Sequence, residues 1–475
     1  MKTTYTPAGD DYLGQRRLRR HARVLHLWAM GVGAVISGDF FGWNFGLTAG
    51  GFGGMMLAVV AMTAMYIGLC LSIAEMSPAL PHAGGAYSFA RTSMGVWAGY
   101  ITGLAENMEY ILTPAVIVVG IGGYLGAVFG TSHAWEPVWW LVAYGVFVAL
   151  NVWGVEMTFK VSVAVTLMAL AVLAVFWIGA APRLDLARWA TPYFPAGRSW
   201  TSAAIAELPF ALWLYLGIEQ LPLAAEESHD PKRDMPRGIL WGLATLIVAS
   251  FLTVVFSAGI APGAAEVAKS DKPLFLAFQT IFGIGLQSRV LALVACTGLI
   301  ASFHTIIFAY GRQIYSLSRA GYFPTWLSVT HGKRETPHRA LLAGSALGFL
   351  AALVIYLMPQ GSPVGAVLLN MAVFGAVIAY ILQMISFIAL RVRFPRMARP
   401  YRSPAGIAGA VVALVVAAVT LVVLFGNPDY NKGVIGAAVW FVLGIAYFAV
   451  HGRRGLVLSP EEEAALLHRK EEGMQ

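Results

Sequence analysis

The feature that most restricts how this chain can fold is a glycine-rich interruption in its first long apolar segment. Residues 31–46 read GVGAVISGDFFGWNFG, with five glycines and one carboxylate, Asp39. A membrane-spanning helix normally excludes both, because glycine weakens a helix and an unpaired Asp at depth costs at least ~2.5 kcal/mol. A helix broken inside a membrane is tolerated where its freed backbone lines a cavity or is buried in protein. The sequence therefore predicts a broken membrane helix, unwound near Ser37–Phe41, with a binding site at the break.

The rest of the chain is also membrane-like. Of its 475 residues, 58% are hydrophobic and 12% are charged, against about 25% charged in an ordinary soluble domain. Because no soluble domain fits between the apolar runs, residues 22–451 are expected to form one membrane domain between short tails, 1–21 and 452–475. A spanning helix needs about 20 residues, and the runs that approach this length are 25–48, 53–79, 95–128, 136–152, 158–180, 203–224, 237–260, 287–316, 340–358, 364–392, 406–426 and 432–451.

The placement of Lys and Arg predicts the orientation. With the N-terminus inside, 25 of the 32 Lys and Arg residues fall in inside segments. Positive residues concentrate on the cytoplasmic side of membrane proteins, so both termini are expected to be cytoplasmic, in an inner or plasma membrane. Because the basic residues are spread along the inner rim, the net charge of +8 does not indicate nucleic-acid binding.

A second apolar segment, 203–224, is interrupted in the same way, by Pro209, Gly217 and Pro222. The two interrupted segments each open a block of five spans, which is the sequence pattern of an inverted repeat with its site between the breaks. We therefore expect an all-α membrane protein with 12 transmembrane helices, a 5+5 inverted repeat and breaks in helices 1 and 6. The expected substrate-binding residues are Ser37, Gly38, Asp39, Phe40, Trp213, Tyr215 and Gly217.

Acidic residues inside apolar segments are candidates for a functional role. Two of them, Glu106 and Glu109, are one helical turn apart and so share a face. The alternatives are that an acid reaches the outer vestibule or pairs within the bundle, and that a lone histidine is a hydrogen-bonded core residue. The candidates for coupling or gating are Glu106, Glu109, Glu207, Glu219, Ser302 and His304.

Several motifs resemble the amino acid–polyamine–organocation (APC) family of permeases. They occur in the family's order over residues 25–405 and are GVGAVI at 31–36, Glu75 with PHAGGAY at 81–87, YLGIE at 215–219, AEESHDP at 225–231, GRQIYSLSRAGYFP at 311–324, and LR at 390–391 with RPY at 399–401. The resemblance implies a leucine-transporter-type fold, alternating access, and a substrate held between the broken segments of helices 1 and 6. By family position Trp213 resembles an aromatic gate.

The chain departs from the family pattern at two places. Amino-acid carriers of the family usually have Gly-Ser-Gly at the first break, whose backbone N–H groups hold the substrate carboxylate, whereas this chain has Ser37-Gly38-Asp39. Many proton-coupled relatives carry a Lys in helix 5, and the corresponding stretch here, VTLMA at 165–169, has none. The coupling ion, H⁺ or Na⁺, is therefore left open.

Asp39 bears directly on the substrate. The N-terminus of a half-helix attracts an anion, and Asp39 would meet that demand from within the protein. It would also repel a second carboxylate by about 4 kcal/mol at ~4 Å and a dielectric of ~20, or ~10³-fold in affinity. This favours a small organic cation, whose ammonium could also contact Trp213 or Tyr215. The alternatives are that Asp39 only caps the second half-helix and that the aromatic residues only pack in the core.

The segment SGDFFGWN at 37–44 resembles the ethanolamine permease branch of the family. We therefore expect a secondary permease that imports a small cationic amine, most simply ethanolamine. The alternatives are an amino-acid, polyamine or choline permease of the same superfamily, or a transporter-like sensor. An enzyme is not expected, because metal-ligand spacings, nucleophile elbows and phosphate loops are missing. Two single cysteines in apolar runs indicate no metal site, no cofactor is expected, and the oligomeric state is left open.

Overall fold

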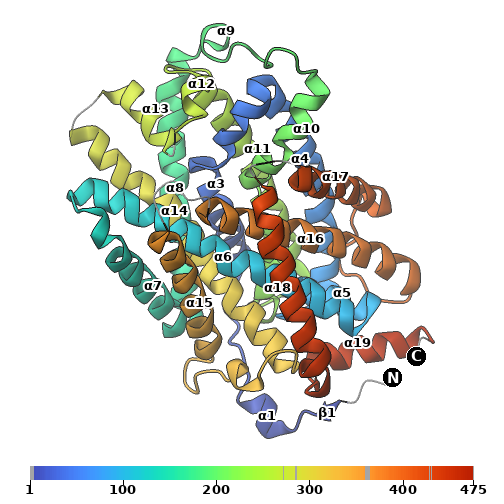
Figure 1. Ribbon diagram of the computed structural model, residues 1–475. Helices are drawn as coiled ribbons and strands as arrows, with labels where there is room; N and C mark the ends of the chain where they lie inside the picture. The colour runs from blue at the N-terminus through green and yellow to red at the C-terminus, as the bar shows by residue number, and fades with distance from the viewer. Residues whose placement is uncertain are drawn as a thin grey trace.

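The computed structural model describes residues 5–270, 272–283, 286–358, 364–426, 428 and 430–473. Long helices run through the whole molecule (Figure 1). The long helices outside the broken segments are α6 (Val96–Phe129), α7 (Glu136–Trp153), α8 (Val155–Ala180), α11 (Pro231–Ala258), α14 (Leu286–Arg319), α15 (His338–Leu357), α16 (Val364–Arg393), α17 (Gly406–Gly426) and α18 (Asn431–Val450). A further long helix, α4 (Leu47–Ala79), is kinked at Gly51.

Two membrane segments are divided into pieces. The first consists of α2 (Val24–Val35), α3 (Ser37–Phe40) and the 3₁₀ turn η1 (Trp43–Gly46). The second consists of α10 (Trp200–Ala211), η4 (Leu212–Leu214) and η5 (Ile218–Glu227). Both segments are central, because α2 packs against α8, α11 and α14, while α10 packs against α4.

Ten stretches of the described residues form helices long and apolar enough to cross a membrane. The expected span 25–48 is not among them, because the break leaves only Val24–Phe40 as a shorter apolar helix. The expected span 287–316 coincides with α14, where part of the helix has side chains outside the described residues. The fold is thus an all-α, multi-span membrane protein.

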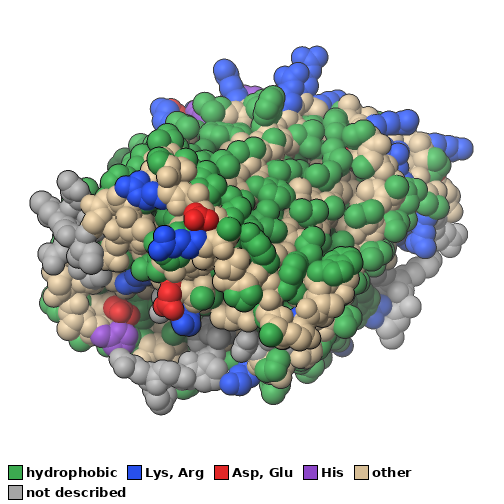
Figure 2. Space-filling model, turned by 90° about the horizontal axis from the view of Figure 1, so that it is seen from above, with side chains coloured by type: hydrophobic (Ala, Val, Ile, Leu, Met, Phe, Trp, Pro, Cys, Tyr) green, Lys and Arg blue, Asp and Glu red, His purple; other side chains and the backbone are tan. Residues whose placement is uncertain are grey.

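The outer surface of the helices is apolar. Large hydrophobic side chains are among the most exposed in the molecule, including Leu141, Ile178, Trp241, Ile435 and Val442, which are 62–74% exposed. Seen from above, hydrophobic side chains are also widespread among the other side chains and the backbone, and few acidic groups are visible (Figure 2). An apolar surface of this extent is typical of a protein whose solvent is lipid, where each helix satisfies its own backbone hydrogen bonds.

Short elements connect the long helices. They are η2 (His133–Trp135), η3 (Ala181–Arg183), η6 (Thr325–Ser328), η7 (Gly452–Arg454), α5 (Gly85–Met94), α9 (Leu186–Trp189), α12 (Ala264–Val267) and α13 (Pro273–Phe282). The charged segment 225–237 between two apolar runs is largely helical, because η5 ends at Glu227 and α11 already begins at Pro231. Proline suits the first turn of a helix, where its missing N–H would have no partner.

The expectation that both ends of the chain are simple tails is also incomplete. The N-terminal segment contains β1 (Thr6–Pro7) and α1 (Asp10–Gly14), and the C-terminal segment contains β2 (Val457–Leu458) and α19 (Pro460–Glu471). The strands β1 and β2 pair in parallel, and both termini lie at the same end of the molecule (Figure 1). The two segments therefore form a docked layer over that end.

Two glutamates attach α19 to the membrane domain. Glu461 is bonded to Arg319 at the end of α14, and Glu462 receives a hydrogen bond of 2.6 Å from Nε of Arg91 in α5. Both carboxylates are buried. Burial raises the pKa of Glu461, but Arg319 and His82 more than offset this effect, and the pKa falls from 4.5 to about 2. The charged form of Glu461 is thus the form that holds α19 in place.

Candidate substrate site

The first break is held open by one serine of α14. The Ser302 hydroxyl donates to the Gly33 carbonyl at 2.9 Å and accepts from the Ser37 N–H at 3.0 Å. These are backbone groups on either side of the turn at Ile36, where α2 ends. A buried backbone group without a partner is costly, so Ser302 replaces the bonds that the break removes. Phe41 is then fully extended and Gly42 has a φ of 101°.

The second break meets the first in direct contact. A side chain on Gly38 would place its Cβ 1.9 Å from the Trp213 carbonyl oxygen, so only glycine fits there. At the second break Gly217 has a φ of 109°, a conformation that side chains disfavour. Its N–H donates to a Glu219 carboxylate oxygen at 3.0 Å. The two glycines therefore allow the interrupted backbones to approach one another, as the sequence pattern suggested.

Asp39 lies at this meeting point and is 1% exposed. Within the described part of the chain, neither of its carboxylate oxygens has a hydrogen-bond partner. The Thr253 hydroxyl of α11 lies beside it without forming a bond of good geometry. The interpretation of Asp39 as a helix cap is thus wrong, because a cap would accept a backbone N–H. A buried carboxylate without partners is costly unless a cation or a proton joins it.

Trp213 lies beside a cavity at the first broken segment. The indole packs over Gly42, with its Cγ 3.5 Å from where a Cβ would be, and is 5% exposed. It also forms part of the wall of a cavity of about 400 Å³. Other residues of that wall are Phe45, Phe210, Asn370, Tyr430 and Lys432. Trp213 therefore contacts both the first broken segment and the cavity.

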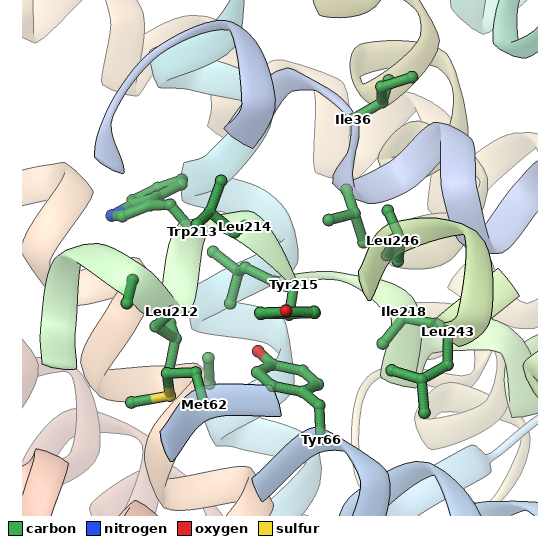
Figure 3. Close-up of a cluster of buried hydrophobic side chains, with 14 of the residues drawn as sticks. Ile36, Met62, Tyr66, Leu212, Trp213, Leu214, Tyr215, Ile218, Leu243 and Leu246 are labelled. Atoms are coloured by element: carbon green, nitrogen blue, oxygen red, sulfur yellow. The ribbon is translucent and has the colours of Figure 1, made fainter. Parts of the chain in front are cut away.

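The Tyr215 side chain is held in place by two hydroxyl contacts and one ring contact. Its hydroxyl is 2.7 Å from both Thr63 of α4 and Ser250 of α11. Its ring stacks on Tyr66, with centroids 5.0 Å apart, as Figure 3 shows. A contact between substrate and this hydroxyl would have to replace one of these bonds. Thr63, Tyr66 and Ser250 were not found from the sequence, because hydroxyl residues in an apolar run give no distinctive signal.

The Phe40 side chain packs against α14. Its ring packs on Gly298 of α14, where an added Cβ would lie 2.5 Å from the ring. The side chain is 1% exposed. This packing makes Phe40 a wall between the first break and α14.

A cluster of three buried acids lies on the other side of the second break. Glu106 of α6 accepts a hydrogen bond from Gln313 at 2.7 Å. One turn further along α6, Glu109 is also buried and lies near Glu219, and one carboxylate oxygen of each has no hydrogen-bond partner among the described residues. Two neighbouring buried carboxylates repel each other unless a proton or a cation joins them.

The remaining candidates lie apart from this cluster. His304 is buried between α7 and α8, with one ring nitrogen 3.3 Å from Asn151 and the other 3.1 Å from the Thr158 carbonyl. Glu207 accepts from the Gly50 N–H at 2.9 Å, beside the kink of α4 at Gly51. Both contacts are those of hydrogen-bonded core residues. No group of three His, Cys, Asp or Glu residues that could hold a metal ion is found in the described ranges.

Comparison with known proteins identifies the family. The amino acid permease family matches residues 26–452. The chain belongs to this family. An uncharacterized transporter of Rhizobium meliloti (strain 1021) is 29% identical over 92% of this chain and 93% of its own length. The branched-chain amino acid permease of Bacillus subtilis (strain 168) is 25% identical over 93% and 95%. A probable GABA permease of Pseudomonas aeruginosa is 22% identical over 92% of each.

The permease is therefore a transporter of small molecules and not an enzyme. Its membership in the APC superfamily, expected from the motifs, is confirmed. Two of these relatives are thus named as a branched-chain amino acid permease and a probable GABA permease. They favour the alternative of an amino-acid permease over ethanolamine as the substrate of this chain.

Proposed function

We propose that the chain is a secondary permease that binds the ammonium of a small amine at Asp39 and moves it by alternating access. The observation that carries the proposal is the buried Asp39 carboxylate, without hydrogen-bond partners in the described residues, at the meeting of two broken helices. In this proposal the halves of the chain form a 5+5 inverted repeat of 12 spans, and Trp213 closes over the substrate. Both termini are cytoplasmic, and transport is inward across an inner or plasma membrane.

The family relatives support an amino acid as the substrate, while Asp39 supports an amine without a carboxylate. In a site with one buried carboxylate, a second one on the substrate is repelled unless a proton or cation compensates. Ethanolamine satisfies the charge of Asp39 and brings no second carboxylate. An amino acid remains compatible if its carboxylate is bound by a group other than Asp39.

We further propose that the pair Glu109–Glu219 carries the coupling proton. Glu219 bonds the Gly217 N–H, so a change in its protonation alters the support of the second break. Glu109→Gln and Glu219→Gln should each abolish uptake driven by a proton gradient. Counterflow, which moves no net proton, should persist. Uptake that follows a sodium gradient and is indifferent to both variants would contradict this assignment.

The substrate class is tested by uptake into proteoliposomes. Labelled ethanolamine, choline, putrescine, alanine and valine are compared in the same preparation. We expect ethanolamine to exceed alanine and valine. Saturable uptake of the amino acids with no competition by ethanolamine would establish the amino-acid alternative.

A further inference from the structure

A second cavity lies where the N-terminal segment meets the α7–α8 junction. Its volume is about 350 Å³, within the range of small-ligand sites, ~300–1,000 Å³. Three segments build it: the residues before α2, the α7–α8 junction, and the connection between α14 and α15. It shares no residue with the cavity beside Trp213.

Positive charge dominates the walls of this cavity. Arg19, Lys160, Lys333 and Arg334 line it, with Glu156 as the one acid among the lining residues. Glu156 pairs with Lys160 at 2.7 Å, so three cations remain without a carboxylate inside the cavity. Such a cluster repels itself in the absence of an anion.

His21, on the wall of the cavity, lies near charges of both signs. Burial lowers the pKa of His21, Glu156 raises it, and His229, Lys160 and Arg19 lower it further. The net pKa lies below its ordinary value of 6.5.

The cavity also has the marks of a membrane interface. Trp153 on its wall is 63% exposed, and the Arg334 guanidinium lies 4.9 Å from the centre of that indole ring. Met157, also on the wall, is 39% exposed. Exposed tryptophans gather at the level of lipid headgroups, and basic pockets on the cytoplasmic side of helix bundles suit anionic headgroups.

We propose that this cavity binds the phosphate group of an acidic phospholipid of the inner leaflet, with the acyl chains lying along Trp153 and Met157. The proposal rests on the cytoplasmic orientation proposed above and not on the substrate. Its bound headgroup would also steady the transport elements, because the His21 and Ala22 N–H groups donate to the Glu227 carbonyl at 2.7 and 2.8 Å. That contact joins the entry of α2 to the end of η5.

The test uses the full purified chain in detergent micelles, titrated with phosphatidylglycerol, phosphatidylcholine or inorganic phosphate, with the thermal unfolding midpoint as readout. The variant is Lys333→Gln with Arg334→Gln. The control is Arg453→Gln with Arg454→Gln, a second adjacent pair of cations that does not line the cavity. We expect phosphatidylglycerol alone to stabilise the native chain. The cavity pair should weaken its apparent affinity about thirtyfold and the control pair should leave it unchanged.

Equal losses in the two paired variants would show diffuse attraction to the surface and overturn the proposal. Stabilisation by inorganic phosphate equal to that by the lipid would overturn the lipid assignment in favour of a free anion. If the cavity pair fails to fold, Arg19→Gln takes its place, with an expected loss of about fivefold. An unchanged affinity in Arg19→Gln would then overturn the proposal.

Discussion

Replacing Asp39 by asparagine should affect substrate binding and protein stability differently. The carboxylate is 1% exposed and accepts no hydrogen bond from the described residues. A buried charge without partners destabilises the empty protein. Asp39→Asn removes that charge with almost no change in volume, so the thermal unfolding midpoint should stay the same or rise.

Substrate binding should change in the opposite direction. A hydrogen bond between a carboxylate and an ammonium contributes about 1.5–3 kcal/mol, so its loss should weaken amine affinity tenfold or more. The repulsion of a substrate carboxylate, about 4 kcal/mol at ~4 Å and a dielectric of ~20, disappears in the same variant. The ratio of the affinities for ethanolamine and alanine should therefore fall for two reasons: ethanolamine binds more weakly, and alanine is no longer repelled.

The assay measures both substrates in one preparation. Binding of labelled ethanolamine and alanine to purified wild type and Asp39→Asn is compared by scintillation proximity, with unfolding midpoints recorded in parallel. Retained ethanolamine affinity in a well-folded variant would refute the assignment of Asp39 to the ammonium. A large fall in the unfolding midpoint would show instead that the carboxylate has a structural partner.

Three further changes test other parts of the structure. Trp213→Ala should weaken substrate affinity or slow occlusion without preventing folding, and unchanged transport with lowered thermal stability would make Trp213 a packing residue only. Gly38→Ala should lower the free energy of unfolding by at least ~1–3 kcal/mol, because the added methyl group clashes with the second break. The control Gly123→Ala, which has open space around it, should leave stability unchanged or raise it, and the unfolding midpoints of both variants measure the difference. The folded pKa of Glu461 is lowered to about 2 from 4.5. Its contribution to stability is therefore complete above pH 4.5 and is lost as the pH falls toward 2, so Glu461→Gln should reduce the dependence of the thermal unfolding midpoint on pH in this range. An unaltered pH dependence in the variant would assign it to other groups.

The family and the membrane character were predictable because they depend on local and repeated features. Apolar runs of spanning length are visible residue by residue. Glycine and proline mark only candidate breaks, because α6 continues through Pro114 whereas the second segment is interrupted at Gly217. The interruption of the first segment was predictable but its position was not: Ser37–Phe40, expected to be unwound, form α3, and the backbone leaves helical geometry at Phe41 and Gly42. The motifs in order along the chain were likewise sufficient for the APC superfamily.

Tertiary structure decided which polar groups are satisfied. Glu207, Ser302 and His304 look alike in a sequence as polar residues in apolar runs, yet each is hydrogen-bonded to a neighbouring helix. Asp39 differs from them only because the described residues provide it with no partner. The docking of α19 could not be predicted from the sequence either, because Glu461 pairs with Arg319, which is 142 positions away in the chain. Local patterns specify where a helix forms or breaks, while the partner of a buried charge depends on which helices the packing brings together.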